Sequence, residues 1–371
     1  MENYSISLPS YSISLPSYSI GNNVYEKINE ICLPFGKKAI CIGGKTAISK
    51  IKNLIIDACK GSELEILGFL WYGGDATYAN VEKLEENELV KNADIIFAIG
   101  GGKALDTAKA LAFRTKKDVF TFPTIASNCA GTTAVSIMYN DDGSFKEPFF
   151  FTAPPRHCFI YTPVIAKSPA KFMWAGIGDT YAKYFESEMS SRGEDLVHYH
   201  ALGVTASKMC LTPLLKYGKK ALDDFKSGTA SFEVEQALLA IIVTTGIASI
   251  LLTAEHIIDY NTGLAHAVFY ALTSYPHIEQ RHLHGEVVGY GVLVLLLVDK
   301  NEEMFNTMFE FNKSISLPTC LADIEMNEND LDRLVPMVCA MKDIDHNPYE
   351  ITNDMVFEAF KKLEEYNKNN K

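Results

Sequence analysis

The feature that most constrains the fold is an alternation of short apolar runs with helical stretches between residues 38 and 127. Runs such as KAICIG (38–43) and IIFAIG (95–100) are apolar almost throughout, and each precedes a stretch with helical periodicity. Strands that are apolar on both faces and alternate with helices are typical of a parallel sheet covered by helices. The sequence therefore predicts an α/β domain with a parallel sheet.

The pattern changes at about residue 163, after which long helical patterns dominate and strand-like runs disappear. Just before this point, residues 134–151 form two alternating runs around an Asp-Asp-Gly turn, which predicts a β-hairpin. A chain of 371 residues exceeds what one core usually supports. We therefore expect an N-terminal extension (1–17), an α/β nucleotide-binding domain (18–162) and an all-α domain (163–371), with the ligand between the two domains.

The N-terminus contains a direct duplication. The heptapeptide YSISLPS occurs at Tyr4–Ser10 and again at Tyr11–Ser17, and a third YSI comes directly after it. Each copy alternates apolar and polar residues up to its proline, which is the pattern of a short edge strand. Because two copies cannot both fill one edge position, we expect the first to be a disordered extension or a cloning scar.

Charge and cysteine content exclude several classes of protein. The net charge of −12 argues against a nucleic-acid binder, which needs a basic face for phosphates. The eight cysteines form no CxxC pair, which favours reduced thiols in a cytoplasmic protein. The first residues have neither the basic region nor the unbroken apolar run of a secretory signal, which also favours the cytoplasm.

One segment tests the expectation that no membrane is involved. Ala237–Ala254 carries no charge and has about the minimum length of a membrane span. It is flanked by Glu235 and Glu255 rather than by basic residues, and it contains three threonines, a serine and a glycine. We therefore expect a buried central helix.

The glycine turn in IGGGKALDTAK, Ile99–Lys109, predicts an anion site. Glycines let the backbone approach a phosphate, and the first N–H groups of the following helix point toward it. The turn is not a Walker A loop, because Phe97 rather than glycine stands five residues before Gly102. It is not a GxGxxG fingerprint either, because Leu105 stands at the third glycine position. A tight turn that binds nothing stays open as the alternative from this segment alone.

A second polar loop comes after the next predicted strand. Two such loops at the carboxyl ends of neighbouring parallel strands are typical of a nucleotide site. The hydroxyl groups of this loop belong to Thr124, Ser127, Thr132 and Thr133.

Three residues at helix starts form a possible metal site. Asp179 lies after two glycines, and His266 and His284 each lie at the start of an apolar helical pattern. One carboxylate and two imidazoles can converge on a divalent metal with an open coordination position. From spacing alone, a structural role is about equally favoured. We expect the remaining histidines with no clear context to be surface or satisfied core residues, namely His157, His198, His200, His256, His277 and His346.

Five motifs in order resemble those of the glycerol dehydrogenases within the iron-containing alcohol dehydrogenase superfamily. They are GGGKALDTAK, PTIAS, GIGDTYAKYFE, HAVFYALT and HGEVVGYG, and the resemblance runs from about Tyr18 to the end of the chain. It implies a dehydroquinate synthase-like fold, in which an NAD(P)-binding α/β domain precedes an all-α metal-binding domain. It also implies a homo-oligomer.

The resemblance implies that Asp179, His266 and His284 are the catalytic metal ligands. Iron-using relatives have a further histidine ligand four residues beyond the aspartate. Lys183 stands there in this chain, which favours Zn²⁺ over Fe²⁺ or another divalent metal. The implied cofactor-binding residues are Gly44, Lys45, Gly100, Gly101, Gly102, Lys103, Ala104, Leu105, Asp106, Thr124, Ile125, Ala126, Ser127, Thr133, Val135 and Tyr139.

The reaction is a consequence of the implied site. A divalent metal lowers the pKa of a substrate hydroxyl, and the carbinol hydrogen can leave as hydride to the nicotinamide of NAD or NADP. The sequence therefore predicts a metal-dependent oxidoreductase that interconverts a small secondary alcohol or polyol, such as glycerol or a diol, with the ketone.

Three departures from the family pattern bear on specificity. Gly44 replaces an aspartate that holds the adenosine ribose in NAD-using relatives, and Lys45 is adjacent, which predicts that NADPH is accepted. Cys129 replaces the aspartate that contacts the polyol substrate, and a thiol accepts hydrogen bonds poorly, which puts glycerol in doubt. Phe269 replaces a histidine common three residues after the first metal histidine, which makes the site more apolar.

Three other functions stay open. A dehydroquinate synthase-like lyase or a glycerol-1-phosphate dehydrogenase-like enzyme would need a basic phosphate pocket, for which Lys183 and Arg281 are the nearby residues. A non-catalytic NAD(P)-binding relative also stays open, because one family aspartate and one family histidine are missing.

Overall fold

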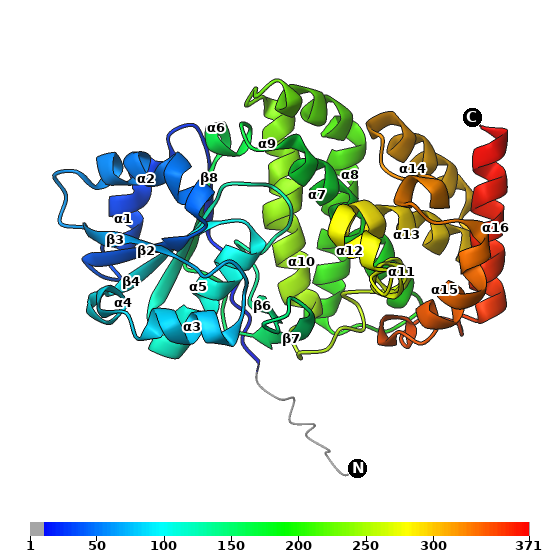
Figure 1. Ribbon diagram of the computed structural model, residues 1–371, viewed down its shortest axis with the longest axis horizontal. Coiled ribbons are helices and arrows are strands. Elements are labelled where there is room, and N and C mark those ends of the chain that lie inside the picture. The colour runs from blue at the N-terminus through cyan, green and yellow to red at the C-terminus, as the bar shows by residue number, and fades with distance from the viewer. Residues whose placement is uncertain (1–10, 371) are drawn as a thin grey trace, which may run out of the picture.

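The computed structural model describes residues 11–370. Its sheet and its helical part lie side by side along the longest axis, with the N-terminal half at one end and the C-terminal helices at the other (Figure 1). The main sheet has six parallel strands in the order β1-β8-β5-β4-β2-β3. The strands are β1 (Tyr18–Gly21), β2 (Lys38–Gly43), β3 (Glu65–Trp71), β4 (Ile95–Gly100), β5 (Asp118–Pro123) and β8 (His157–Tyr161).

The central strands are apolar because both faces of the sheet are covered. Every residue of β4 is buried, and alternate side chains enter two separate cores. One core contains Phe97 and lies under α1 (Ile28–Cys32) and α2 (Lys45–Cys59), whereas the other lies under the remaining helices of this half. Those helices are α3 (Tyr78–Glu85), α4 (Glu88–Asn92) and α5 (Gly102–Thr115). The predicted alternating parallel-sheet architecture is confirmed.

The edge strand does not come from a copy of the heptapeptide. Strand β1 begins at Tyr18, in the third YSI, and pairs in parallel with β8. Residues 11–17, the second copy, have no regular secondary structure, so the prediction of an edge strand there is wrong. Pro16 explains this in part, because proline has no N–H to donate to a ladder. The first copy, residues 4–10, lies outside the described residues.

The hairpin prediction is confirmed. Strands β6 (Val135–Tyr139) and β7 (Phe145–Phe150) pair antiparallel in a separate two-stranded sheet. Gly143 in the connecting turn has φ of 87°, a conformation that favours glycine.

From residue 162 to residue 370 the described chain is helical, with no strand. A short helix, α6 (Thr162–Ile165), leads from the sheet into the helical part. The domain limits at residues 162 and 163 stay a prediction. The longer helices are α7 (Ala170–Ser190), α8 (His198–Lys226), α9 (Phe232–Leu238), α10 (Thr245–Leu252), α11 (Leu264–Leu272), α12 (Pro276–Arg281), α13 (His284–Val298), α14 (Glu302–Ile315), α15 (Leu331–Val338) and α16 (Asn353–Asn369).

The uncharged segment forms one continuous helical stretch, Phe232–Leu252. A π-helical section, Leu239–Thr244, joins α9 to α10 within it. By length and composition the stretch could cross a membrane, but 72% of its most apolar window is buried inside the protein. It packs against α8, which is the arrangement of a core helix.

Candidate active site

Close packing of α7 on α13 brings two of the predicted ligands together. A Cβ atom on Gly178 would lie 2.1 Å from the carbonyl oxygen of Gly285, and one on Gly285 would lie 2.0 Å from that of Ala175. Only glycine fits at these two positions, which explains the motifs GIGD and HGE. Because Asp179 and His284 are the neighbours of these glycines, the helix crossing sets their separation.

A third helix, α11, completes the cluster with His266. Asp179 Oδ1 lies 3.2 Å from His284 Nε2 and 3.6 Å from His266 Nε2. One ligand atom from each of the three residues lies within 4.8 Å of the other two. The structure therefore brings together the three residues that the sequence singled out, and their donor atoms suit a divalent cation.

Glu186 is part of this cluster and was missed by the sequence reasoning. Its Oε2 lies 2.7 Å from His266 Nδ1, and its Oε1 accepts hydrogen bonds of 2.9 Å from the backbone N–H groups of Gly263 and His266. The carboxylate thus fixes Nδ1 as the protonated nitrogen of His266 and leaves Nε2 facing Asp179. The signal in the sequence was its position two helical turns after Asp179 on the same face of α7.

The carboxylates of Asp179 and Glu186 give the cluster a negative charge that favours a cation. Burial of the His266 imidazole opposes its protonation, but the charges of Glu186 and Asp179 outweigh burial and raise its pKa to about 10. Burial likewise opposes ionisation of Asp179, but His284 and His266 hold its pKa well below its usual range. A divalent cation can replace the proton that these two carboxylates attract.

Cys129 lies in the loop after β5, close to Asp179. Burial, and then the charge of Asp179, raise the pKa of the Cys129 thiol to about 12, while the Lys183 ammonium opposes this rise. The thiol is therefore neutral at physiological pH. The same loop packs on α7, because the Ala126 carbonyl oxygen lies 2.4 Å from where a Cβ on Gly176 would be.

Phe269 and Lys183, which stand where relatives have histidines, also lie at the cluster. The Phe269 ring packs edge-on against the His284 ring, with centroids 4.3 Å apart. The Lys183 ammonium donates to the backbone oxygen of Asn261 and, at 2.8 Å, to its Oδ1. Lys183 is thus not oriented as a metal ligand. By contrast, Arg281 is exposed and pairs with Glu325 at 2.6 Å.

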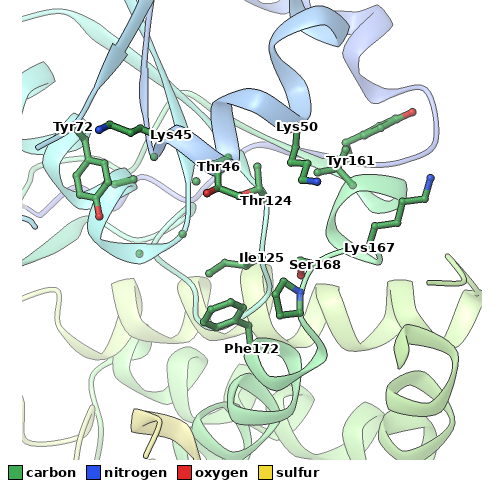
Figure 2. A pocket seen from close by; sticks show the side chains of 18 of the residues that line it. Lys45, Thr46, Lys50, Tyr72, Thr124, Ile125, Tyr161, Lys167, Ser168 and Phe172 are labelled. Carbon is green, nitrogen blue, oxygen red and sulfur yellow. The ribbon is translucent and has the colours of Figure 1, made fainter. Parts of the chain in front are cut away.

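A cleft of about 1350 Å³ lies between the carboxyl ends of the strands and the start of the helical part (Figure 2). Asp179, His266 and His284 do not line it. Its size is ample for a large part of a dinucleotide. Residues not predicted from the sequence also line it, among them Lys50, Tyr72, Tyr161, Lys167 and Phe172. The predicted cofactor residues that line it are Gly44, Lys45, Gly100, Gly101, Gly102, Lys103, Ala104, Thr124 and Ile125.

The glycine turn opens α5 directly onto this cleft. Gly100 has φ of 144°, which side chains rarely adopt, and a Cβ on Gly101 would lie 2.4 Å from the Ile125 side chain. Helix α5 begins at Gly102, so its first N–H groups lie at the wall of the cleft. This is the geometry of an anion site at a helix N-terminus.

The remaining predicted cofactor residues do not line the cleft. Asp106 is buried and pairs with the Lys109 ammonium at 2.9 Å. Lys109 also donates to the hydroxyl of Thr133 at 3.1 Å and to the carbonyl of Val135 at 2.6 Å. These residues hold the loop after β5 in shape, and a direct contact with the cofactor stays a prediction. The others are Leu105, Ala126, Ser127 and Tyr139, of which Tyr139 stacks under the Lys103 ammonium.

The histidines predicted to be structural are mostly placed as expected. His157 lies between the hydroxyls of Ser17 and Ser19, at 2.7 and 2.9 Å. His200 differs, because it is buried and its Nε2 has no hydrogen-bond partner among the described residues. Burial lowers the pKa of His200, which therefore packs as a neutral ring against Tyr260.

Comparison with known proteins gives matches along the whole chain. The family described as iron-containing alcohol dehydrogenase matches residues 16–158. Glycerol dehydrogenase of Thermotoga maritima is 33% identical over 309 residues, which cover 80% of this chain and 81% of that protein. Hydroxycarboxylate dehydrogenase A of Escherichia coli is 28% identical over 334 residues, covering 89% and 90%. The crystal structure of glycerol dehydrogenase from Schizosaccharomyces pombe has the same fold, with a TM-score of 0.85 at 23% identity, covering 98% of this chain and 92% of that one.

Proposed function

This chain belongs to the iron-containing alcohol dehydrogenase family, and on that premise we propose that Asp179, His266 and His284 hold its catalytic metal. The enzyme is a metal-dependent, NAD-linked oxidoreductase that acts on the CH–OH group of a small alcohol or polyol. The observation that carries the site assignment is the convergence of the three ligand atoms within 4.8 Å.

Each residue of the cluster has a distinct task in this proposal. Bound among them, a divalent metal stabilises negative charge on the substrate oxygen. Asp179 supplies one negative charge to the site. Glu186 accepts the proton of His266 Nδ1 in a hydrogen bond and so keeps the lone pair of His266 Nε2 directed at the site. Phe269 supports one side of the His284 ring, whose side chain stays 44% exposed.

The cofactor occupies the neighbouring cleft. The first N–H groups of α5 bind its pyrophosphate, and the loop that contains Thr124 and Ile125 leads from the cleft to α7 beside Asp179. A dinucleotide held by these residues would supply the acceptor for the hydride that leaves the substrate carbon.

We propose Zn²⁺ as the metal. A site with one carboxylate, two imidazoles and one open position suits tetrahedral zinc. The position that supplies a further histidine in the iron-using relatives is Lys183, whose ammonium is tied to Asn261.

We also propose that NADPH is accepted. No carboxylate lines the cleft among the described residues, and a Cβ on Gly44 would meet nothing closer than 3.8 Å. Lys45, stacked 4.4 Å over Trp71, and Lys50 lie on the same wall of the cleft, and their charges favour a 2′-phosphate (Figure 2).

The phosphate-dependent alternatives lack a suitable pocket. Arg281 is exposed and paired with Glu325, and Lys183 is the one cation placed beside the cluster in the described part of the chain. The convergence of all three metal ligands also argues against a non-catalytic relative. A homo-oligomeric state and a cytoplasmic location stay predictions.

The function can be tested with zinc-reconstituted enzyme and a panel of glycerol, 1,2-propanediol, 2,3-butanediol, simple secondary alcohols and glycerol-1-phosphate. NAD⁺ and NADP⁺ are compared as oxidants. We expect turnover of at least one alcohol that falls by several orders of magnitude in Asp179→Ala. If no alcohol gives turnover that depends on Asp179, the assignment is overturned.

A further inference from the structure

One face of α7 carries all the residues that this helix contributes to the site. Gly176, Asp179, Lys183 and Glu186 recur at intervals of three or four residues and therefore share that face. Gly176 packs on the loop after β5, Asp179 contacts both imidazoles, and Glu186 orients His266. Lys183 lies between the last two, one helical turn from the proposed metal ligand.

Lys183 is a buried cation without a matching anion. It is 6% exposed, and both of its hydrogen-bond acceptors are oxygens of Asn261. An ammonium has three N–H donors, so one is left over. In the described part of the chain, no carboxylate oxygen lies within the 4.0 Å of a salt bridge to it, whereas His266 has two such partners. A buried charge that only neutral amides satisfy remains poorly compensated.

Position 129 offers no anion to the site. The glycerol dehydrogenase pattern has an aspartate there, and this chain has a thiol that stays neutral. Lys183 follows Asp179 by four residues on α7, so both side chains leave the same face of that helix. Compared with the glycerol dehydrogenase pattern that the chain resembles, the site has one negative charge fewer, at position 129, and it contains the positive charge of Lys183. A negatively charged substrate would meet attraction from Lys183 and no repulsion from position 129.

We propose that the substrate carries a carboxylate next to its carbinol carbon, that is, a 2-hydroxy acid, and that Lys183 binds this carboxylate. The inference rests on the proposed function and specifies its substrate class. One helical turn, about 5.4 Å, separates Lys183 from Asp179, which suits two adjacent polar groups of one small molecule. The name of the Escherichia coli relative, hydroxycarboxylate dehydrogenase A, agrees with this class.

The reaction balances with the cofactor of the family. The 2-hydroxy acid loses its carbinol hydrogen as hydride to C4 of NAD(P)⁺ and its hydroxyl proton to solvent. The products are a 2-oxo acid, NAD(P)H and one proton. The carboxylate does not react, so Lys183 acts as a binding residue.

The test uses two substrates with the same carbon skeleton, 2-hydroxybutanoate and 1,2-butanediol, and the full-length zinc enzyme. We expect the wild type to prefer the hydroxy acid. In Lys183→Met the KM for 2-hydroxybutanoate should rise about 10- to 100-fold, the loss of one charge-assisted hydrogen bond. The ratio of kcat/KM for the acid to that for the diol should fall by the same factor. Lys208→Met, an exposed position on α8, is the matched control and should change neither value.

Zinc content and Tm of each variant separate binding from a structural role. If Lys183 only anchors Asn261, Lys183→Met will lose zinc or thermal stability, and kcat/KM will fall by the same factor for both substrates. That result contradicts the proposal. Turnover of the diol but not of the hydroxy acid by the wild type overturns the substrate class and leaves the proposed function intact. Turnover of neither substrate overturns the substrate class, and it overturns the proposed function as well only if no alcohol of the panel above gives turnover that depends on Asp179.

Discussion

Replacing Glu186 by Gln tests the part of the site that holds His266. The carboxylate accepts three hydrogen bonds, from His266 Nδ1 at 2.7 Å and from the backbone N–H groups of Gly263 and His266 at 2.9 Å. The amide of Gln has one accepting oxygen, and its NH₂ group would face Nδ1. To accept from that NH₂, the imidazole must move its proton to Nε2, the nitrogen that faces Asp179.

A proton on His266 Nε2 would occupy the nitrogen that is proposed to bind the metal, so we expect the substitution to weaken metal binding. Loss of an outer-shell partner of a metal-bound histidine typically costs 10- to 100-fold in metal affinity. This range corresponds to about 1.4 to 2.8 kcal/mol, close to the value of one hydrogen bond to a charged group. Because the side chain of Glu186 is fully buried, solvent does not screen this contribution.

A chelator competition titration measures the zinc affinity directly. Glu188→Gln is the matched control, because Glu188 lies on the same helix but pairs with Arg192 at the surface. We expect Glu186→Gln to weaken zinc binding 10- to 100-fold and the control to leave it unchanged. A folded Glu186→Gln protein that binds zinc within twofold of the wild type would refute the reasoning.

Three further predictions address the cofactor, the helix crossing and the thiol. Lys45→Asp should raise the KM for NADP⁺ at least tenfold and change that for NAD⁺ much less, as measured by initial rates. Gly178→Ala places a Cβ 2.1 Å from the Gly285 carbonyl oxygen, so it should lower Tm by several degrees and reduce bound zinc; an unchanged Tm would contradict the close packing. Because the pKa of Cys129 is raised to about 12, its alkylation rate should increase about tenfold per pH unit from pH 7 to 10, and a plateau below pH 10 in peptide mass spectrometry would contradict this.

The fold was predictable because its signals are local. Strand β4 is apolar at every position and precedes a glycine turn, so both its burial and its connection to α5 can be read from adjacent residues. The edge strand was misplaced by one repeat, because the three copies of YSI share one alternating pattern and differ only in the residues after it. Only the pairing of Tyr18 with Cys158, 140 residues away, selects the strand.

The metal cluster was predictable from motifs, whereas its surroundings depend on tertiary contacts. The spacing of Glu186 from Asp179 places it on the same face of α7, but its contact with His266 spans 80 residues of sequence and cannot be read from that spacing. Likewise, the buried pair of Asp106 and Lys109 looks like part of a cofactor motif in sequence, but in the fold it ties down the loop after β5. Lys50 and Lys167 line the same cleft although they come from separate parts of the chain, α2 and the segment after α6.

The most direct test of the central claim is a crystal structure of the zinc-loaded enzyme with anomalous data collected on both sides of the zinc absorption edge. We predict one strong anomalous peak bonded to Asp179, His266 Nε2 and His284 Nε2, with an open position toward Cys129. A peak elsewhere, or none among these three side chains in a protein that retains alcohol-dependent reduction of NAD(P)⁺, would contradict the account.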